Sequence, residues 1–554
     1  MTGPEQNIWA EPGTGENTEN EKNRLQMQVI DGQGASASKE REKETEETKR
    51  LKGNFGFFGP AAFIYAVFYT FCMYRNGSGV TFPFFVAGSL LFLYLSLTKL
   101  ETTLKKGSAF YMAAMVLLGI STFCTDDGRI IFFNKLGIFL LMMSLLLKQY
   151  FDTSKWGLGK FLQSIFHLAF ASFGEVVRPF QDAAGYRKAR NGKIDKRVWA
   201  VGLGLLVGVP LVFVVLMLLA SADVLFRQMT DALLGNINFG NIMNVVFRIV
   251  FMFLASYCLT SYLCRKRIRE EVKDKRTGEP VLAITVTSML TVLYIIFSAI
   301  QIEGLFLGRM QLPEGYTYAS YAREGFFQLL AVSLLNLVIV LVCLYYFKGS
   351  KVLKTILTIM SVCTFVLIAS SAMRMVMYIK SYYLTFLRVL VLWALALLAV
   401  LFAGVLINIF KTGFPLFRYS VAVVTVLYLA LSLVHPDYII ARVNVANIAV
   451  TESGEKSAAA YHDYWYLSGL CADAAPVLVP YMEKQGYAME AWTAEETPRE
   501  YSREINGVRA SIDREDTFGY AWMERMQKRT EGFGARTFNL SRYRMLRLLD
   551  KAGK

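Results

Sequence analysis

The feature that most limits the fold of this chain is a series of apolar runs, each close to twenty residues long. A helix needs about 20 such residues to cross the roughly 30 Å hydrocarbon core of a bilayer. Only 19% of the 554 residues are charged, against about 25% in soluble proteins. We therefore predict an all-α, polytopic integral membrane protein with about eleven spans. The runs are 55–74, 80–98, 108–124, 130–147, 199–220, 243–264, 281–306, 326–347, 355–378, 384–410 and 419–434.

Two further stretches have apolar stripes but are too polar to count as spans. Residues 156–177 place apolar side chains at helical spacing, with Lys160, His167 and Glu175 among them. This pattern is typical of an amphipathic helix that lies in the plane of the membrane, although a crossing helix remains an alternative. Residues 221–240 carry three charged residues and are not expected to span.

The positions of Lys and Arg predict the topology, because short cytoplasmic loops carry an excess of them. Residues 38–54 and the even-numbered connections hold 31 Lys and Arg, whereas the odd-numbered connections hold six. We therefore expect a multi-pass protein of the cell membrane with a cytoplasmic N-terminus and an extracytoplasmic C-terminus. The expected domains are a disordered tail (1–53), a transmembrane domain (54–435) and a small, mainly helical C-terminal domain (436–554) with helices near 520–530 and 540–549.

Several functions are not expected from the composition and motifs. The formal net charge is +15, but most basic residues lie in gaps between apolar runs, so we expect the lipid bilayer and not nucleic acid as the partner. The seven cysteines show no paired spacing, and no phosphate-binding loop or dinucleotide motif is present. Six possible ligands (His435, Asp437, His462, Asp463, Cys471 and Asp473) lack the short intervals of a metal site. We predict no metal, no cofactor and no catalytic set.

Ionisable residues near the outer ends of the spans are the best functional candidates, because charge within a membrane is costly. Arginine could bind an anionic headgroup or sugar phosphate by paired hydrogen bonds. The alternative is that these side chains only reach toward the headgroups or fix helix packing. The expected ligand-binding residues, brought to one side by the topology, are Arg323, Arg374, Arg388, Arg442, Glu303, Glu314, Asp223 and Tyr321.

A set of short motifs carries a resemblance to a known family. The motifs are Ser221-Ala222-Asp223, the polar and aromatic stretch 313–327, Leu384-Thr385-x-x-Arg388-Val389, Pro436-Asp437 with Ala441-Arg442-x-Asn444-Val445, 463–467, Asp473-Ala474-x-Pro476 and Phe538-Asn539-Leu540-Ser541-Arg542. From about residue 200 onward the chain resembles the uncharacterised multi-pass membrane family called domain of unknown function 4173. The resemblance implies a bacterial cell-membrane protein of Gram-positive type, and it supplies no activity. One departure is His435, where the family pattern has Asn.

The first functional hypothesis is a non-enzymatic membrane protein whose outer face binds an anionic cell-envelope ligand or a partner membrane protein, in a sensing or assembly role. An alternative is a transporter or flippase of an anionic lipid-linked substrate, which requires the arginine cluster to continue inward as a wettable path. A third is a membrane transferase that uses Glu314, Asp223 or Glu303 as a base.

Overall fold

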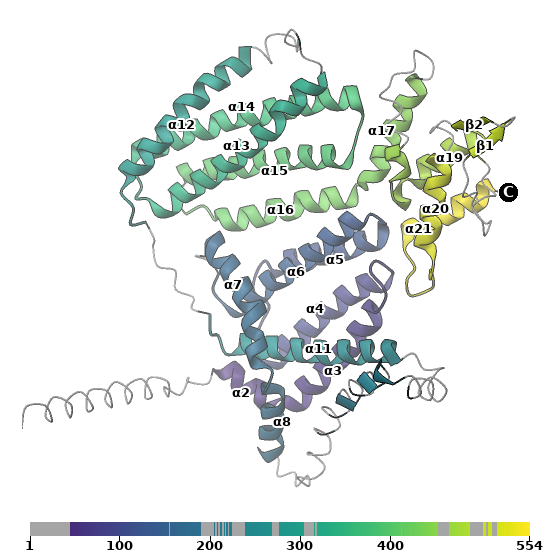
Figure 1. Cartoon of the computed structure of the whole chain (residues 1–554). Helices are drawn as coiled ribbons and strands as arrows, with labels where there is room; N and C mark the ends of the chain where they lie inside the picture. Colours follow the sequence, from purple (N-terminus) through teal and green to yellow (C-terminus); the bar gives the residue numbers. More distant parts are fainter. Residues whose placement is uncertain are drawn as a thin grey trace, which may run out of the picture.

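The computed structural model is built almost entirely from helices (Figure 1). It describes residues 45–153, 156–189, 239–268, 276–303, 318–411, 413–451, 465–487, 502–505, 508–511 and 518–553, with isolated positions at 315 and between 204 and 226. Most of the expected tail, residues 1–44, lies outside the described part. The prediction of a polytopic helical membrane protein is confirmed.

Nine helices in the described ranges are long and apolar enough to cross a membrane. A tenth apolar helix, α5 (Ser108–Cys124), is shorter. These ten correspond to ten of the eleven expected spans, and the remaining one, 199–220, lies outside the described residues. The nine are α3 (Phe55–Met73), α4 (Thr81–Lys99), α6 (Gly128–Tyr150), α11 (Phe239–Cys264), α12 (Pro280–Gln301), α13 (Tyr318–Tyr346), α14 (Lys351–Tyr382), α15 (Phe386–Phe410) and α16 (Leu416–Leu433).

Helices α3, α4, α5, α6 and α11 form a first bundle around one buried apolar core that includes Phe58, Met115 and Leu145. The core extends to helix α2 (Glu46–Gly53), whose Leu51 is buried. Thr45 caps α2 and donates a hydrogen bond to the carbonyl of Cys264 on α11 (2.5 Å). The last eight residues of the expected disordered tail are therefore folded, because they bury a leucine and carry their own N-cap.

The polar segment after α6 forms helix α7 (Leu158–Ala171), a short 3-10 turn (Ser172–Glu175) and helix α8 (Arg178–Ala189). At fourteen residues α7 is too short to span. It buries Phe161 and Leu168 and exposes Phe166 and Phe170. Figure 1 shows it running across the end of the first bundle and not along the spans, as expected for an in-plane amphipathic helix.

Helices α12 to α16 form a second bundle with its own apolar cores. It meets the first bundle where α16 packs on α5 and α6. This contact is hydrogen-bonded: the hydroxyls of Ser121 and Ser432 are 2.6 Å apart, and Oδ1 of Asn134 accepts from Ser432 and from Tyr428, each at 2.8 Å. Hydroxyl and amide groups satisfy one another in such a contact between apolar helices.

The C-terminal domain follows α16 directly. Its elements are α17 (Pro436–Thr451), a 3-10 turn η3 (Ala472–Ala474), α19 (Ala475–Lys484), α20 (Phe518–Thr530) and α21 (Leu540–Ala552). They enclose an apolar core around Trp522, which also includes Leu384 of the connection between α14 and α15. The two helices expected near 520–530 and 540–549 are α20 and α21. A two-stranded antiparallel hairpin, β1 (Ser502–Ile505) and β2 (Val508–Ser511), was not expected.

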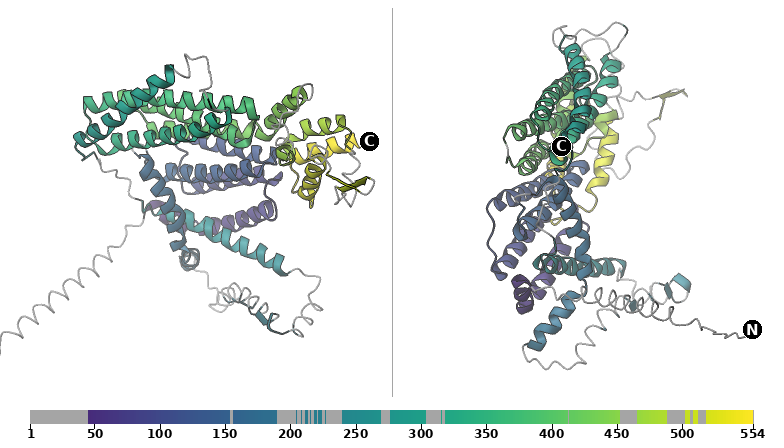
Figure 2. Two further views of the ribbon diagram at one scale, coloured as in Figure 1. Left: turned by 45° about the horizontal axis from the view of Figure 1, so that its top comes forward. Right: turned by 90° about the vertical axis from the view of Figure 1, so that its left-hand side faces the viewer.

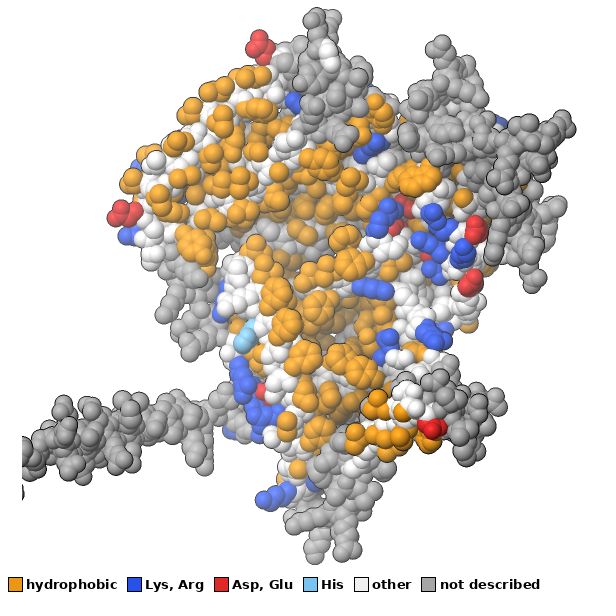
Figure 3. Space-filling model, in the orientation of Figure 1, with side chains coloured by type: hydrophobic (Ala, Val, Ile, Leu, Met, Phe, Trp, Pro, Cys, Tyr) orange, Lys and Arg blue, Asp and Glu red, His pale blue; other side chains and the backbone are white. Residues whose placement is uncertain are grey.

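The molecule has two different ends, which we name by what lies there. The domain end carries the C-terminal domain, and the tail end carries α2, α7 and α8 (Figures 1 and 2). Figure 2 shows the two bundles stacked on each other, with the domain beside their shared end. Figure 3 shows apolar side chains over the spans and charged side chains gathered toward the ends. This distribution is that of a protein embedded in a lipid bilayer.

Candidate functional site

The densest polar arrangement described lies where the C-terminal domain meets the first bundle. Its starting point is the turn between α5 and α6, which contains Thr125, Asp126 and Asp127. Asp127 caps α6, and its carboxylate accepts the backbone N–H of Arg129 at 2.9 Å. A capping aspartate satisfies a free N–H group and favours the helix dipole. The turn thus presents two carboxylates to the domain.

Asp126 joins this turn to the two last helices of the chain. Its fully buried carboxylate accepts hydrogen bonds from Arg529 of α20 (2.7 Å) and Arg542 of α21 (2.6 Å). The side chains of these arginines retain 37% and 26% of their exposure, so each reaches in from the surface. Charge-assisted hydrogen bonds of this length are stronger than neutral ones.

Asp473 in η3 makes the second connection. It accepts hydrogen bonds from the Thr125 hydroxyl (2.5 Å), the Asp126 backbone N–H (3.0 Å) and the Ser541 hydroxyl, and Nδ1 of His435 lies at 3.2 Å. Burial alone would raise the pKa of Asp473. The hydrogen bonds from His435, Ser541 and Thr125 outweigh burial and hold that pKa below its ordinary value.

Arg129 makes the third connection, between α6 and the start of α17. Its guanidinium pairs with Asp127 (2.7 Å) and with Asp437 (2.6 Å). It also covers the ring of Phe386 at 3.8 Å. Asp437 accepts the backbone N–H of Cys471 at 3.0 Å. Burial and the nearby charge of Asp127 raise the pKa of Asp437, and the attraction of Arg129 only partly opposes them.

Backbone contacts surround these ion pairs. Asn539 caps α21 and donates to the carbonyls of Ser78 (3.0 Å) and Thr125 (2.9 Å) in two loops of the first bundle. Asn444 of α17 exchanges two hydrogen bonds with the backbone of Leu384, which lies between α14 and α15. The domain is thereby attached to both bundles.

We call the eight charged or ionisable residues of this arrangement the charge cluster: Asp126, Asp127, Arg129, His435, Asp437, Asp473, Arg529 and Arg542. Its four aspartates are almost fully buried and each accepts several hydrogen bonds. Carboxylates occupied in this way hold elements together and are poorly available as bases. Among the described residues, no three His, Cys, Asp or Glu side chains are placed to hold a metal ion.

Two of the arginines predicted for ligand binding have clear local partners. Arg388 donates to the backbone carbonyls of Tyr382 and Tyr383 and lies 4.3 Å from the ring centre of Tyr378. Arg374 lies 3.3 Å from Oε1 of Gln301 on α12, beside Gly325 of α13. Arg374 of α14 therefore lies where the ends of α12 and α13 meet α14.

The other predicted residues are less closely tied. Glu303 is exposed just after α12, and Asp223 is exposed with its carboxylate on the N–H of Phe226. Arg442 is exposed on α17, on a different element. Tyr321 and Arg323 belong to α13, but their side chains are outside the described part, as is Glu314. A single ligand-binding cluster of the eight residues stays a prediction.

The charge cluster was missed from the sequence, although several of its members lie in the motifs noted above. Asp437, Asp473 and Arg542 all belong to those motifs, and the structure brings them to one place. Asp126 and Asp127 lie in the short connection between the expected spans 108–124 and 130–147 and were not predicted as site residues. Two adjacent aspartates beside an apolar span are the signal that could have identified them.

Comparison with known proteins agrees with an uncharacterised family but not with the number expected from the motifs. The model of the domain of unknown function DUF4153 matches residues 112–481, about two thirds of the chain. The chain belongs to the DUF4153 family. The expected assignment to domain of unknown function 4173 is not supported. No curated protein and no solved structure matches the chain. The DUF4153 region contains all four aspartates of the charge cluster, whereas Arg529 and Arg542 lie beyond it.

Proposed function

We propose that this integral membrane protein binds an anionic ligand of the cell envelope through its C-terminal domain, in a sensing or assembly role. The observation that carries the proposal is the charge cluster, which holds the domain in a fixed position on the spans. A domain fixed in this way presents its remaining surface at a constant height above the bilayer.

That remaining surface is basic on its two last helices. Arg525 and Lys528 on α20, and Arg544 and Arg547 on α21, are all exposed. Each pair is three residues apart, so its members lie on one face of their helix. Lys528 has a neighbour in Glu524 (2.7 Å), whereas no described carboxylate pairs with Arg544 or Arg547 among the ion pairs found. Arginine is suited to phosphate because its planar group donates two parallel hydrogen bonds.

The topology supports placing this surface outside the cell. Of the Lys and Arg in the connections between spans, most lie in the loops at the tail end. Loops rich in Lys and Arg are cytoplasmic in most membrane proteins. The domain end is then extracytoplasmic, where anionic polymers and lipid headgroups of an envelope are found. The predicted residues Arg374, Arg388 and Arg442 are proposed as a second contact region of the same end.

The experiment measures binding of the full-length protein, in an uncharged detergent, to poly(glycerol phosphate) as an anionic probe. We expect binding that weakens with salt and falls several-fold in the double variant Arg544→Gln/Arg547→Gln. The matched control is Lys351→Gln/Lys354→Gln, which removes the same charge from exposed positions on α14 at the tail end. Equal binding by the two variants, or no binding by the unaltered protein, contradicts the proposal.

A further inference from the structure

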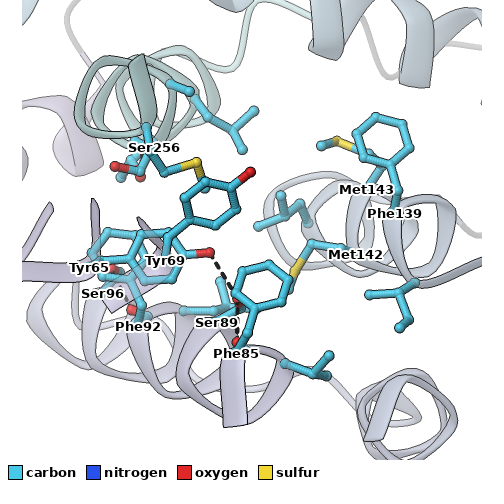
Figure 4. Close-up of a pocket in the computed structure, with 18 of the residues that line it drawn as sticks. Tyr65, Tyr69, Phe85, Ser89, Phe92, Ser96, Phe139, Met142, Met143 and Ser256 are labelled. Carbon is cyan, nitrogen blue, oxygen red and sulfur yellow. Dashed lines mark hydrogen bonds between the residues drawn. The ribbon is translucent and has the colours of Figure 1, made fainter. Parts of the chain in front are cut away.

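The first bundle contains a large apolar cavity that no part of the proposed function uses. It has a volume of about 410 Å³ and lies between α3, α4, α6 and α11. Pockets that hold small organic ligands have volumes of roughly 300–1,000 Å³. Figure 4 shows Met142, Met143 and Phe139 on one side of the cavity and Tyr65, Ser89 and Phe92 on the other, with Ser256 on a third.

Most of the hydroxyl groups in the cavity wall form hydrogen bonds within the protein. The hydroxyls of Tyr65 and Ser89 lie 2.8 Å apart, and Ser89 also bonds to the carbonyl of Phe85. Ser96 and Ser256 bond to carbonyls of their own helices at 2.7 and 3.1 Å. A wall whose polar groups are mostly paired in this way behaves as largely apolar, so it favours hydrocarbon over water.

The cavity is long and has two different ends. Its lining runs along α4 from Phe82 to Ser96, a length of roughly 20 Å at 1.5 Å per residue. This exceeds half of the roughly 30 Å hydrocarbon core. Tyr150 and Leu263, both buried, line the tail end. A chain that enters at the domain end would therefore pass the middle of the bilayer.

The domain end of the cavity carries positive charge. Lys135 is the only charged side chain among the lining residues described, and its ammonium lies 5.7 Å from the ring centre of Phe82. Arg248 is one helical turn from the lining residue Met252, and its guanidinium is 5.9 Å from the ring centre of Tyr74. No ion pair with a described carboxylate is found for either cation. Both lie in the half of their helix nearer the domain end, from where long basic side chains can reach toward the headgroups and meet an anionic lipid.

We propose that this cavity binds one hydrocarbon chain of an anionic, phosphate-bearing lipid, with the phosphate at Lys135 and Arg248. The chain fills the apolar space, and the two cations select the headgroup. The site is separate from the proposed outer-face site, because it uses different residues on α4, α6 and α11. The same chemistry is offered by a diacyl phosphoglycerol lipid and by a polyprenyl phosphate.

The test uses full-length protein in phosphatidylcholine nanodiscs that contain a trace of phosphatidylglycerol with a photoreactive group on one acyl chain. After illumination, we expect labelled peptides to come from the cavity walls, around Met142 and Met252. Ala255→Phe, which fills the cavity, should reduce this labelling at least about tenfold. Val286→Phe is the matched control, because Val286 faces outward on α12. Met252→Trp is a second filling variant, and each variant is used only if it elutes as a single folded species.

The headgroup is tested by competition on the unaltered protein and on Lys135→Gln/Arg248→Gln. Unlabelled phosphatidylglycerol or polyprenyl phosphate should compete better than phosphatidylcholine, and whichever competes more strongly identifies the source of the ligand. Removal of the two cations should reduce this preference roughly 10- to 30-fold, whereas Lys380→Gln, at an exposed position on α14, should not. Labelling that is unaffected by both filling variants, or equal competition by phosphatidylcholine, overturns the proposal.

Discussion

Asp126 is the residue on which attachment of the C-terminal domain depends most directly. The change Asp126→Asn keeps the shape of the side chain but removes its charge. The carboxylate is fully buried and serves two arginines on different helices, so the substitution weakens two charge-assisted hydrogen bonds at once. Each such bond contributes about 1.5–3 kcal/mol.

The expected loss is smaller than the sum of the two bonds. The two arginine side chains are 37% and 26% exposed, so water can solvate them once the charge is gone. We therefore expect the free energy of local opening of α20 and α21 to fall by about 2–4 kcal/mol. This corresponds to a roughly 30- to 700-fold faster hydrogen exchange of their protected amides, at about 1.4 kcal/mol per factor of ten.

The assay is hydrogen exchange by mass spectrometry on the full-length protein in nanodiscs. Glu524→Gln is the matched control, because it makes the same chemical change on α20 in an ion pair with Lys528 whose side chains are 70% and 43% exposed. An exposed pair of this kind contributes about 0–1 kcal/mol. If α20 and α21 exchange equally fast in the two variants, the charge cluster does not hold the domain.

Four further outcomes are expected. Asp473 has a lowered pKa in the folded protein, so its contribution to the stability of the folded domain is complete above the ordinary aspartate pKa and is lost as the pH falls through the lower folded value. Hydrogen exchange in α21 should therefore become faster on acidification, and Asp473→Asn should weaken this pH dependence. Trp522→Ala removes a fully buried side chain and should destabilise the domain by about 3–5 kcal/mol, seen as faster proteolysis after α17. Glu175→Gln removes the buried partner of Arg178, Arg265 and Arg267 and should speed exchange in α7 by roughly tenfold or more, with α21 unchanged. A cysteine placed by Lys554→Cys in a cysteine-free background should react with an impermeant thiol reagent on intact cells, and labelling only after the membrane is opened would reverse the predicted topology.

Much of the fold could be predicted from the sequence because it follows from local composition. Ten described apolar helices correspond to expected spans, since a run of about twenty apolar residues is helical in lipid wherever it packs. The polar interruptions of residues 156–177 predicted a helix that does not span, and α7 has only fourteen residues. The hairpin β1–β2 was missed although Asn506-Gly507, a strong turn signal, stands between its strands.

The site was predicted less well, because its contacts are not local. Asp126 meets Arg542 across 416 positions in the sequence, and Arg129 meets Asp437 across 308. Nothing in a single sequence pairs residues so far apart. The predicted ligand-binding cluster stays a prediction, and Arg388, one of its members, donates hydrogen bonds to the backbone of its own connecting loop.

The attachment of the C-terminal domain has a mechanical consequence. The domain is continuous with the second bundle through α17; it is ion-paired to Asp126 of the first bundle, and its Asp473 accepts hydrogen bonds from Thr125 and Asp126 there. It therefore connects the first and second bundles at the domain end. Rocking of one bundle against the other, the motion by which many carriers expose a site alternately to each side, would have to pivot about these contacts or break them. These contacts therefore favour a fixed arrangement of the two bundles at the domain end.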